Sequence, residues 1–266
     1  MPSMLKSVRS TLVVAGVVIA TVVTPAGPSS AAASRPVGIA SIQPTAAIPV
    51  GVAHPVIVTF SAPVTDRRAA ERAITVHTQP AMTGSYDWVN DTEVQWIPDH
   101  YWPAHSRIAL SVGKLSSEFT TGAQVVGVAN ISEHTFTVTV DGEDPEPLPT
   151  PHHRPHWGEP GVLPATMGKS EFPTPVGHYS VLAKDSKVVM DSSSVGIPID
   201  DPEGYRFEVG QAVRITRRGL YVHSAPWAVR SLGVDNVSHG CVGLSPTDAE
   251  WYFDRVTIGD PVIIEE

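Results

Sequence analysis

The sequence predicts a mainly β protein with two domains and few helices. Short runs of β-branched and apolar residues follow one another at intervals of about ten residues, separated by turn-forming Gly, Asn, Asp and Pro. The 25 prolines in 266 residues agree with this prediction, because proline lacks the N–H group that helix interiors and central strands need. The length leaves room for two ordinary domains.

The first 33 residues have the pattern of an export signal. Lys6 and Arg9 precede an apolar run at residues 11–23, and small residues follow up to the alanines at 31–33. The apolar run is shorter than the roughly 20 residues that span a bilayer. We therefore expect residues 1–33 to be a signal peptide and the mature protein to be exported.

Residues 34–122 are predicted to form a small β-sandwich. Trp88 and Trp96 are its expected core residues, and one short helical turn is expected at 66–73. This part contains no catalytic grouping, which favours a spacer or interaction module. The strand candidates are 54–60, 74–77, 84–88, 93–97 and 107–112.

Residues 123–266 are predicted to form a second β-rich domain with one clear helix. Ser245 is a suitable N-cap, Pro246 suits the first helical position, and Asp248 occupies the capping-box position. The strand candidates are 125–129, 135–140, 178–182, 187–190, 212–216, 220–222 and 262–264.

The loop at residues 141–164 is rich in proline and histidine. His152, His153 and His156 offer imidazoles that could bind a metal, but such a stretch is more often an exposed loop, and we expect no metal site. The formal net charge is −9 and no basic stripe is present, which argues against nucleic acid as a partner.

Cys241 is the single cysteine of the chain, so no internal disulfide can form. Exported proteins usually pair or avoid cysteines, because a free thiol oxidises. A lone thiol is therefore either a reactive group or a small buried hydrophobe, and the count alone does not decide between them.

The surroundings of Cys241 favour a nucleophile. A thiol needs a nearby base, and two histidines are candidates: His239, two residues away, and His223, at the end of a predicted strand. Gly240 permits the unusual backbone angles that expose a sulfur and orient N–H groups toward an oxyanion. Zinc ligation by these residues and a purely structural role for the histidines are the alternatives.

Several segments carry a resemblance. Fourteen residues separate His223 from Ser238-His239-Gly240-Cys241, and SPTDAEWYFD follows at 245–254. In these segments the chain resembles the L,D-transpeptidases of the YkuD type, especially the mycobacterial enzymes. Its N-terminal part, with GVAHPVIVTFSAPVTDRR, resembles the immunoglobulin-like domain of those members. Further matching motifs are MGK at 167–169, TPVGHY at 174–179, MDSSSVGIP at 190–198 and HSAPW at 223–227.

The resemblance implies an immunoglobulin-like β-sandwich followed by a β-rich L,D-transpeptidase catalytic domain with few helices. It implies Cys241 as nucleophile, His223 as general base, the Ser224 carbonyl as the group orienting His223, and His239 with Gly240 shaping the site. No cofactor is implied, since acyl transfer to a thiol needs none. Implied substrate-binding residues are Met190, Tyr205, Trp227, Asn236 and Ser238.

The implied reaction acts on peptidoglycan in the periplasm or cell wall. The thiolate would attack the L-centre carbonyl of diaminopimelate in a tetrapeptide stem, expel D-alanine, and pass the acyl group to the amine of a neighbouring stem in a 3→3 cross-link. Carbapenems are the implied inhibitors. An L,D-carboxypeptidase that uses water as acceptor and a non-catalytic peptidoglycan-binding module are the alternatives.

The chain departs from the family pattern at two positions near the expected site. Gly243 stands where many members have Asn or Arg, and Val195 stands where several have tyrosine. The loop at 141–164 is also longer than expected. These departures bear on rate and substrate preference rather than on the class of reaction.

Overall fold

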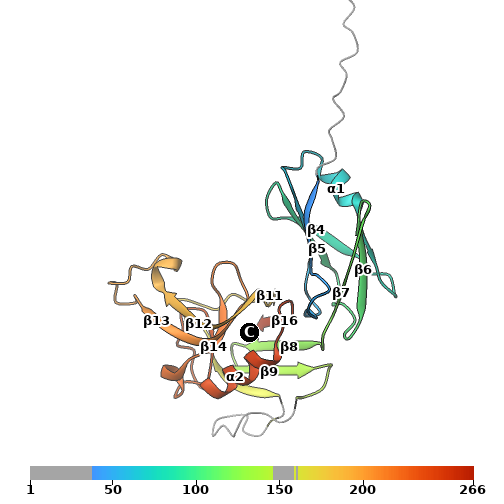
Figure 1. The fold of residues 1–266 in the computed structure, drawn as a ribbon. Helices are drawn as coiled ribbons and strands as arrows, with labels where there is room; N and C mark the ends of the chain where they lie inside the picture. Colours follow the sequence, from blue (N-terminus) through green and yellow to red (C-terminus); the bar gives the residue numbers. More distant parts are fainter. Residues whose placement is uncertain (1–37, 146–158, 160) are drawn as a thin grey trace, which may run out of the picture. The chain divides into compact units, whose positions relative to one another are not determined.

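The computed structural model describes residues 38–145, 159 and 161–266. The expected signal peptide and His152, His153 and His156 lie outside the described residues. Within them, strands predominate, as the sequence predicts, and none of the helices has the length and apolarity to cross a membrane (Figure 1).

The N-terminal domain is a β-sandwich of two sheets. One sheet has the order β1-β2-β5-β4 and the other β3-β6-β7. The five predicted strands are confirmed, while β1 and β7 were not predicted. The strands are β1 (Ile39–Gln43), β2 (Val56–Phe60), β3 (Ile74–His77), β4 (Gly84–Trp88), β5 (Glu93–Pro98), β6 (Arg107–Val112) and β7 (Leu115–Thr120).

The core of this sandwich is aromatic. Trp96 is buried as predicted, whereas Trp88 is only half-buried and stacks on Phe60 at 6.0 Å between ring centroids. The most buried indole is that of Trp102, which was not predicted; its Nε1 donates to the His54 carbonyl at 2.7 Å. The short helix α1 (Arg67–Ala73) is confirmed, with Asp66 as its N-cap.

The second domain is built on a nine-stranded sheet of order β11-β16-β8-β9-β10-β15-β14-β13-β12. Only the β14–β15 and β16–β8 pairs are parallel. The strands are β8 (Val125–Asn130), β9 (Thr135–Val140), β10 (Val162–Thr166), β11 (Gly177–Ser180), β12 (Ala183–Asp191), β13 (Arg206–Arg214), β14 (Tyr221–Ser224), β15 (Val242–Leu244) and β16 (Pro261–Glu265).

One helix of several turns packs on this sheet. Helix α2 (Pro246–Arg255) contacts β13, β14 and β15 (Figure 1). Its predicted N-terminus is confirmed: Ser245 Oγ accepts the Asp248 N–H at 3.1 Å and donates to the Asp248 carboxylate at 2.6 Å. The buried ring of Tyr252 meets Phe136 of β9 edge-on at 4.8 Å. Two 3-10 turns complete the domain, η1 (Ser192–Val195) and η2 (Pro226–Ala228).

Strands β10 and β15 were not predicted. Strand β10 contains Pro164, and a proline within a run of residues argues against a central strand. Pro164 pairs with Thr135 of β9, while β15 pairs with β10 only from Ala165 onward. The missing N–H of Pro164 therefore falls where β10 changes its partner, so no hydrogen bond between strands is lost there. Strand β15 thus lies between β10 and β14, and the candidate site lies at β14 and β15.

Candidate active site

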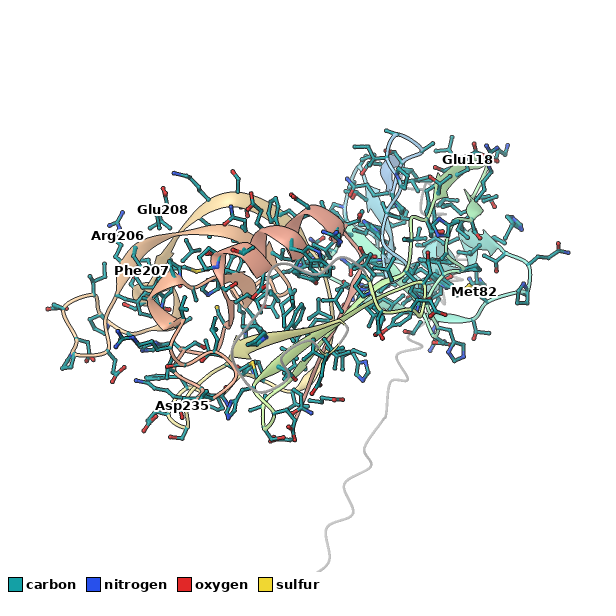
Figure 2. The ribbon with its side chains drawn as sticks, turned by 90° about the horizontal axis from the view of Figure 1, so that it is seen from below. Met82, Glu118, Arg206, Phe207, Glu208 and Asp235 are labelled. Carbon is teal, nitrogen blue, oxygen red and sulfur yellow. The ribbon has the colours of Figure 1, made fainter. Side chains whose placement is uncertain are left out.

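Two neighbouring parallel strands bring Cys241 and His223 to one pocket. His223 of β14 is the register partner of Gly243 in β15, and Cys241 comes directly before β15. Both residues line a cavity of about 240 Å³, which we call the aromatic pocket. Its lining includes Glu203, Tyr205, Phe207, His223, Trp227 and Cys241. Phe207 lies between Arg206 and Glu208 on β13 (Figure 2).

The His223 ring is held in one tautomer. Its Nδ1 lies 2.8 Å from the Ser224 carbonyl oxygen, and because a carbonyl only accepts, Nδ1 must carry the proton. The other ring nitrogen, Nε2, is then free of a proton in the neutral ring. Burial lowers the pKa of His223, and the bond to Ser224 opposes this only in part. His223 is therefore a neutral imidazole, able to accept a proton, at neutral pH.

Cys241 is half-buried and its sulfur has polar neighbours. The thiol lies 3.8 Å from the Gly219 carbonyl oxygen. Burial raises the pKa of Cys241 to about 11, although the Tyr221 backbone N–H favours the thiolate. The resting site is thus a neutral thiol beside a neutral imidazole. A proton must leave the sulfur before the sulfur can attack a carbonyl.

The backbone around Cys241 is fixed by two hydroxyl groups. Gly240 adopts a φ of +115°, which favours glycine and accounts for the Gly in the motif. Ser238 Oγ accepts the Gly240 N–H at 3.0 Å and donates to the Cys241 carbonyl at 2.6 Å. Thr174 Oγ1 donates to the Gly240 carbonyl at 2.8 Å and accepts the Gly168 N–H at 2.7 Å. The turn that presents the sulfur is therefore rigid.

The MGK segment supports the same turn through its backbone. Gly168 forms a parallel bridge with Ser238. The Ser238 N–H donates to the Met167 carbonyl at 2.9 Å, and the Lys169 N–H donates to the Ser238 carbonyl at 3.0 Å. A Cβ at position 168 would clash with the Phe172 carbonyl oxygen, so this position requires glycine.

His239 has a different set of direct partners from His223, although both line the aromatic pocket. Its Nε2 lies 3.0 Å from Glu203 Oε2, the same oxygen that the Lys169 ammonium contacts at 2.6 Å. The His239 ring stacks on Phe172 at 4.7 Å and packs against Tyr205 at 5.0 Å. This environment suits a residue that shapes the site.

A second, larger cavity opens on the other side of the sulfur. It has a volume of about 890 Å³ and shares Met190, Tyr205, His239 and Cys241 with the aromatic pocket. We call it the arginine pocket, because its lining includes Asp191, Arg214, Arg217, Arg218 and Tyr221. Cys241 is thus accessible from two cavities of different character.

The structure brings most of the predicted substrate-binding residues to these cavities. Met190 and Tyr205 line both, while Trp227 and Ser238 line the aromatic pocket. Asn236 lines neither cavity. Its Oδ1 accepts the Met167 N–H at 2.9 Å and contacts His134 Nδ1 at 3.0 Å, and its Nδ2 donates to the Ile131 carbonyl at 3.0 Å.

The two departures from the family pattern have different surroundings. A Cβ at Gly243 would lie 2.9 Å from Thr166 Cγ2 and 3.0 Å from Ala225 Cβ, so neighbouring side chains fill that space. Val195 lines the arginine pocket and is 53% exposed, so a larger side chain there would meet solvent.

Several residues at the site were not singled out from the sequence. Glu203, Lys169 and Thr174 act through side-chain contacts between distant segments, and Thr166 packs against Gly243 across two strands. Lys169 and Thr174 lie in motifs that the resemblance quotes, whereas Glu203 and Thr166 carry no such signal. No group of three or more metal-binding side chains occurs among the residues that the structure describes.

Comparisons with known proteins agree with this architecture. The family model of the bacterial Ig domain matches residues 30–116, and that of the L,D-transpeptidase catalytic domain matches residues 124–264. Probable L,D-transpeptidase 3 of Mycobacterium tuberculosis is 59% identical over 263 residues, which cover 96% of this chain and 97% of the relative. L,D-transpeptidase 1 of the same organism is 48% identical over 225 residues, 85% of this chain and 84% of the relative.

Solved structures show the same fold. The crystal structure of L,D-transpeptidase 3 from Mycobacterium tuberculosis with a faropenem-derived adduct superposes with a TM-score of 0.81 at 63% identity, covering 86% of this chain and 98% of that one. An L,D-transpeptidase in complex with imipenem gives 0.77 at 47% identity, with 86% and 99% covered. The chain belongs to the L,D-transpeptidase family, with a bacterial Ig domain before its catalytic domain.

Proposed function

We propose that this transpeptidase forms 3→3 cross-links between peptidoglycan stem peptides, outside the cytoplasm, through a thioester on Cys241. The observation that carries the proposal is the tautomer of His223. The Ser224 carbonyl holds the proton on Nδ1, so Nε2 remains a base in the pocket that Cys241 also lines.

The first half of the reaction acylates the enzyme. His223 Nε2 accepts the thiol proton of Cys241, and the sulfur attacks the L-centre carbonyl of diaminopimelate in a tetrapeptide donor. Backbone N–H groups beside Cys241 stabilise the oxyanion. As the tetrahedral intermediate collapses, the C–N bond to D-alanine breaks and His223 returns the proton to the leaving amine.

The second half transfers the acyl group to an acceptor. The side-chain amine of a second stem attacks the thioester carbonyl, loses a proton to His223 and expels Cys241 as the thiolate, which His223 reprotonates. Met190, Tyr205 and Trp227 contact the substrates from the pocket walls. Water as acceptor would instead release a tripeptide, the product of an L,D-carboxypeptidase.

The first experiment is intact-protein mass spectrometry after incubation with imipenem. We expect one covalent adduct on the native protein and none on Cys241→Ala, because a β-lactam carbonyl acylates an activated thiol. An unmodified, folded native protein would contradict the proposal and favour a non-catalytic peptidoglycan-binding module. Product analysis with tetrapeptide donors then separates a cross-linked dimer from a shortened tripeptide.

A further inference from the structure

The two cavities beside Cys241 differ in charge. The arginine pocket is lined by Arg214, Arg217 and Arg218 with Asp191 as its single acid, whereas Glu203 is the single charged residue of the aromatic pocket. The whole chain carries a net charge of −9, so this basic wall is opposite in sign to the net charge of the protein.

The three arginines differ in burial and in the number of hydrogen bonds that their guanidinium groups make within the protein. Arg214 is half-buried; its Nε donates to the Thr216 carbonyl at 3.0 Å and its Nη2 to the Arg217 carbonyl at 2.7 Å. Arg214 therefore stabilises the turn between β13 and β14. Arg217 and Arg218 lie on that turn and are exposed.

The guanidinium groups of the two exposed arginines, Arg217 and Arg218, are accessible to a ligand. Arg217 lies 3.5 Å from the carboxylate of Glu93; the Arg217 side chain is exposed, whereas that of Glu93 is half-buried. This single long contact leaves the remaining N–H groups of the Arg217 guanidinium accessible. Arg218 makes no ion pair or side-chain hydrogen bond with any residue that the structure describes. Asp191 has other partners: its Oδ1 accepts from Ser193 N and Oγ at 2.9 and 2.6 Å, and its Oδ2 lies 3.8 Å from Arg206 Nε.

The turn places these groups next to the nucleophile. Arg218 precedes Gly219, whose carbonyl oxygen lies 3.8 Å from Cys241 Sγ, and all three residues line the arginine pocket. Guanidinium groups bind carboxylates through two parallel hydrogen bonds. A peptide whose carbonyl lies at the sulfur can therefore extend a neighbouring carboxylate into this wall.

We propose that Arg218, assisted by Arg217, binds a carboxylate of the donor stem peptide in the arginine pocket and so determines donor specificity. The inference rests on the proposed function. It assigns the donor to the arginine side of Cys241 and requires the donor to be anionic at this contact.

The test measures release of the terminal residue from a tetrapeptide donor and from donors in which each carboxylate in turn is converted to its amide. The released residue is D-alanine, or D-alaninamide where the terminal carboxylate is the one amidated. Arg218→Gln is compared with the native protein and with Arg68→Gln. Arg68 is an exposed arginine of α1, so its replacement changes the net charge equally without touching the pocket. Arg218→Lys keeps the charge but loses the paired hydrogen bonds.

We expect Arg218→Gln to lower kcat/KM about 10- to 100-fold, mostly through KM, since a hydrogen bond to a charged group is lost. One amidated donor should show the same loss with the native protein and no further loss with Arg218→Gln. Arg218→Lys should be intermediate, and Arg68→Gln should behave as native. Equal losses for every amide in both proteins would overturn the inference.

Imipenem separates this inference from the proposed function. Complete acylation of Cys241 in Arg218→Gln, together with the expected loss toward the donor, supports the inference. Normal donor turnover by Arg218→Gln overturns the inference while leaving the proposed function standing. A native protein that neither releases D-alanine nor forms the adduct overturns both.

Discussion

His239 Nε2 lies 3.0 Å from Glu203 Oε2, and this contact joins the residue two positions before the nucleophile to the loop between η1 and β13. Lys169 binds the same oxygen at 2.6 Å and holds the pKa of Glu203 below its usual range, so the carboxylate stays ionised at neutral pH. The same loop carries Tyr205, which packs on His239. The wall shared by the two cavities is therefore stabilised by the contacts of the Glu203 carboxylate with Lys169 and His239, as well as by ring contacts.

Glu203→Ala is expected to slow acylation by imipenem by up to about 10-fold, because a small displacement of reacting groups is costly. The thiol itself should still react with iodoacetamide, since neither Cys241 nor His223 is changed. Glu208→Ala is the matched control: Glu208 pairs with Lys187 on the surface of β13 and lines neither cavity. An acylation rate equal to that of the control would show that the Glu203 contact does not position the site.

His223→Gln should lower the rate of acylation about 10²- to 10⁴-fold, the usual contribution of a general base. The reason is that burial raises the pKa of the Cys241 thiol to about 11, so the thiol is protonated at neutral pH and must give its proton to a base before it can attack. Stopped-flow measurement of imipenem acylation gives the rate. His178→Gln, at an exposed position of β11, should retain native activity. Loss of activity in both variants would point to a general effect on folding.

The pH profile of acylation should show its acid limb below 6.5, the ordinary pKa of histidine. The base must be unprotonated to act, and burial lowers the pKa of His223, so activity persists to lower pH than an exposed histidine would allow. At higher pH the rate should stay level through the weakly alkaline range, because burial raises the pKa of Cys241 to about 11. A limb at pH 8 to 9, the range of an ordinary free thiol, would contradict this account.

Gly243→Ala is expected to destabilise the domain by about 1–3 kcal/mol, the range for overpacking in a core. The added methyl group would lie 2.9 Å from Thr166 Cγ2. Thr166→Ser removes that methyl while keeping the Oγ that donates to the Asp235 carbonyl at 2.7 Å and accepts the Val237 N–H at 3.0 Å. The double variant should therefore recover part of the loss in urea denaturation. Strictly additive losses would show that these two positions do not compete for space.

The local elements followed from sequence because their signals are local. Short β-branched and apolar runs about ten residues apart, separated by turn formers, predicted β2 to β6. The Ser245-Pro246-Asp248 pattern predicted the start of α2, since a capping residue and its partner lie within one turn. Two of the strands that were not predicted, β10 and β15, lack such a signal. Strand β15 has only three residues. Strand β10 contains Pro164, which the sheet tolerates because it lies where β10 changes its pairing partner from β9 to β15.

The sequence by itself determined the mainly β class and singled out Cys241, His223 and the SHGC segment, because one free thiol and spaced motifs can be seen without coordinates. The tertiary structure decided that Nδ1 of His223 is bound to the Ser224 carbonyl and that His239 pairs with Glu203, although both histidines line the aromatic pocket with Cys241. It also turned the side chain of Asn236 away from both cavities and brought Arg218 to one of them. These outcomes depend on strand pairing and on contacts between segments distant in the chain, which no local pattern encodes.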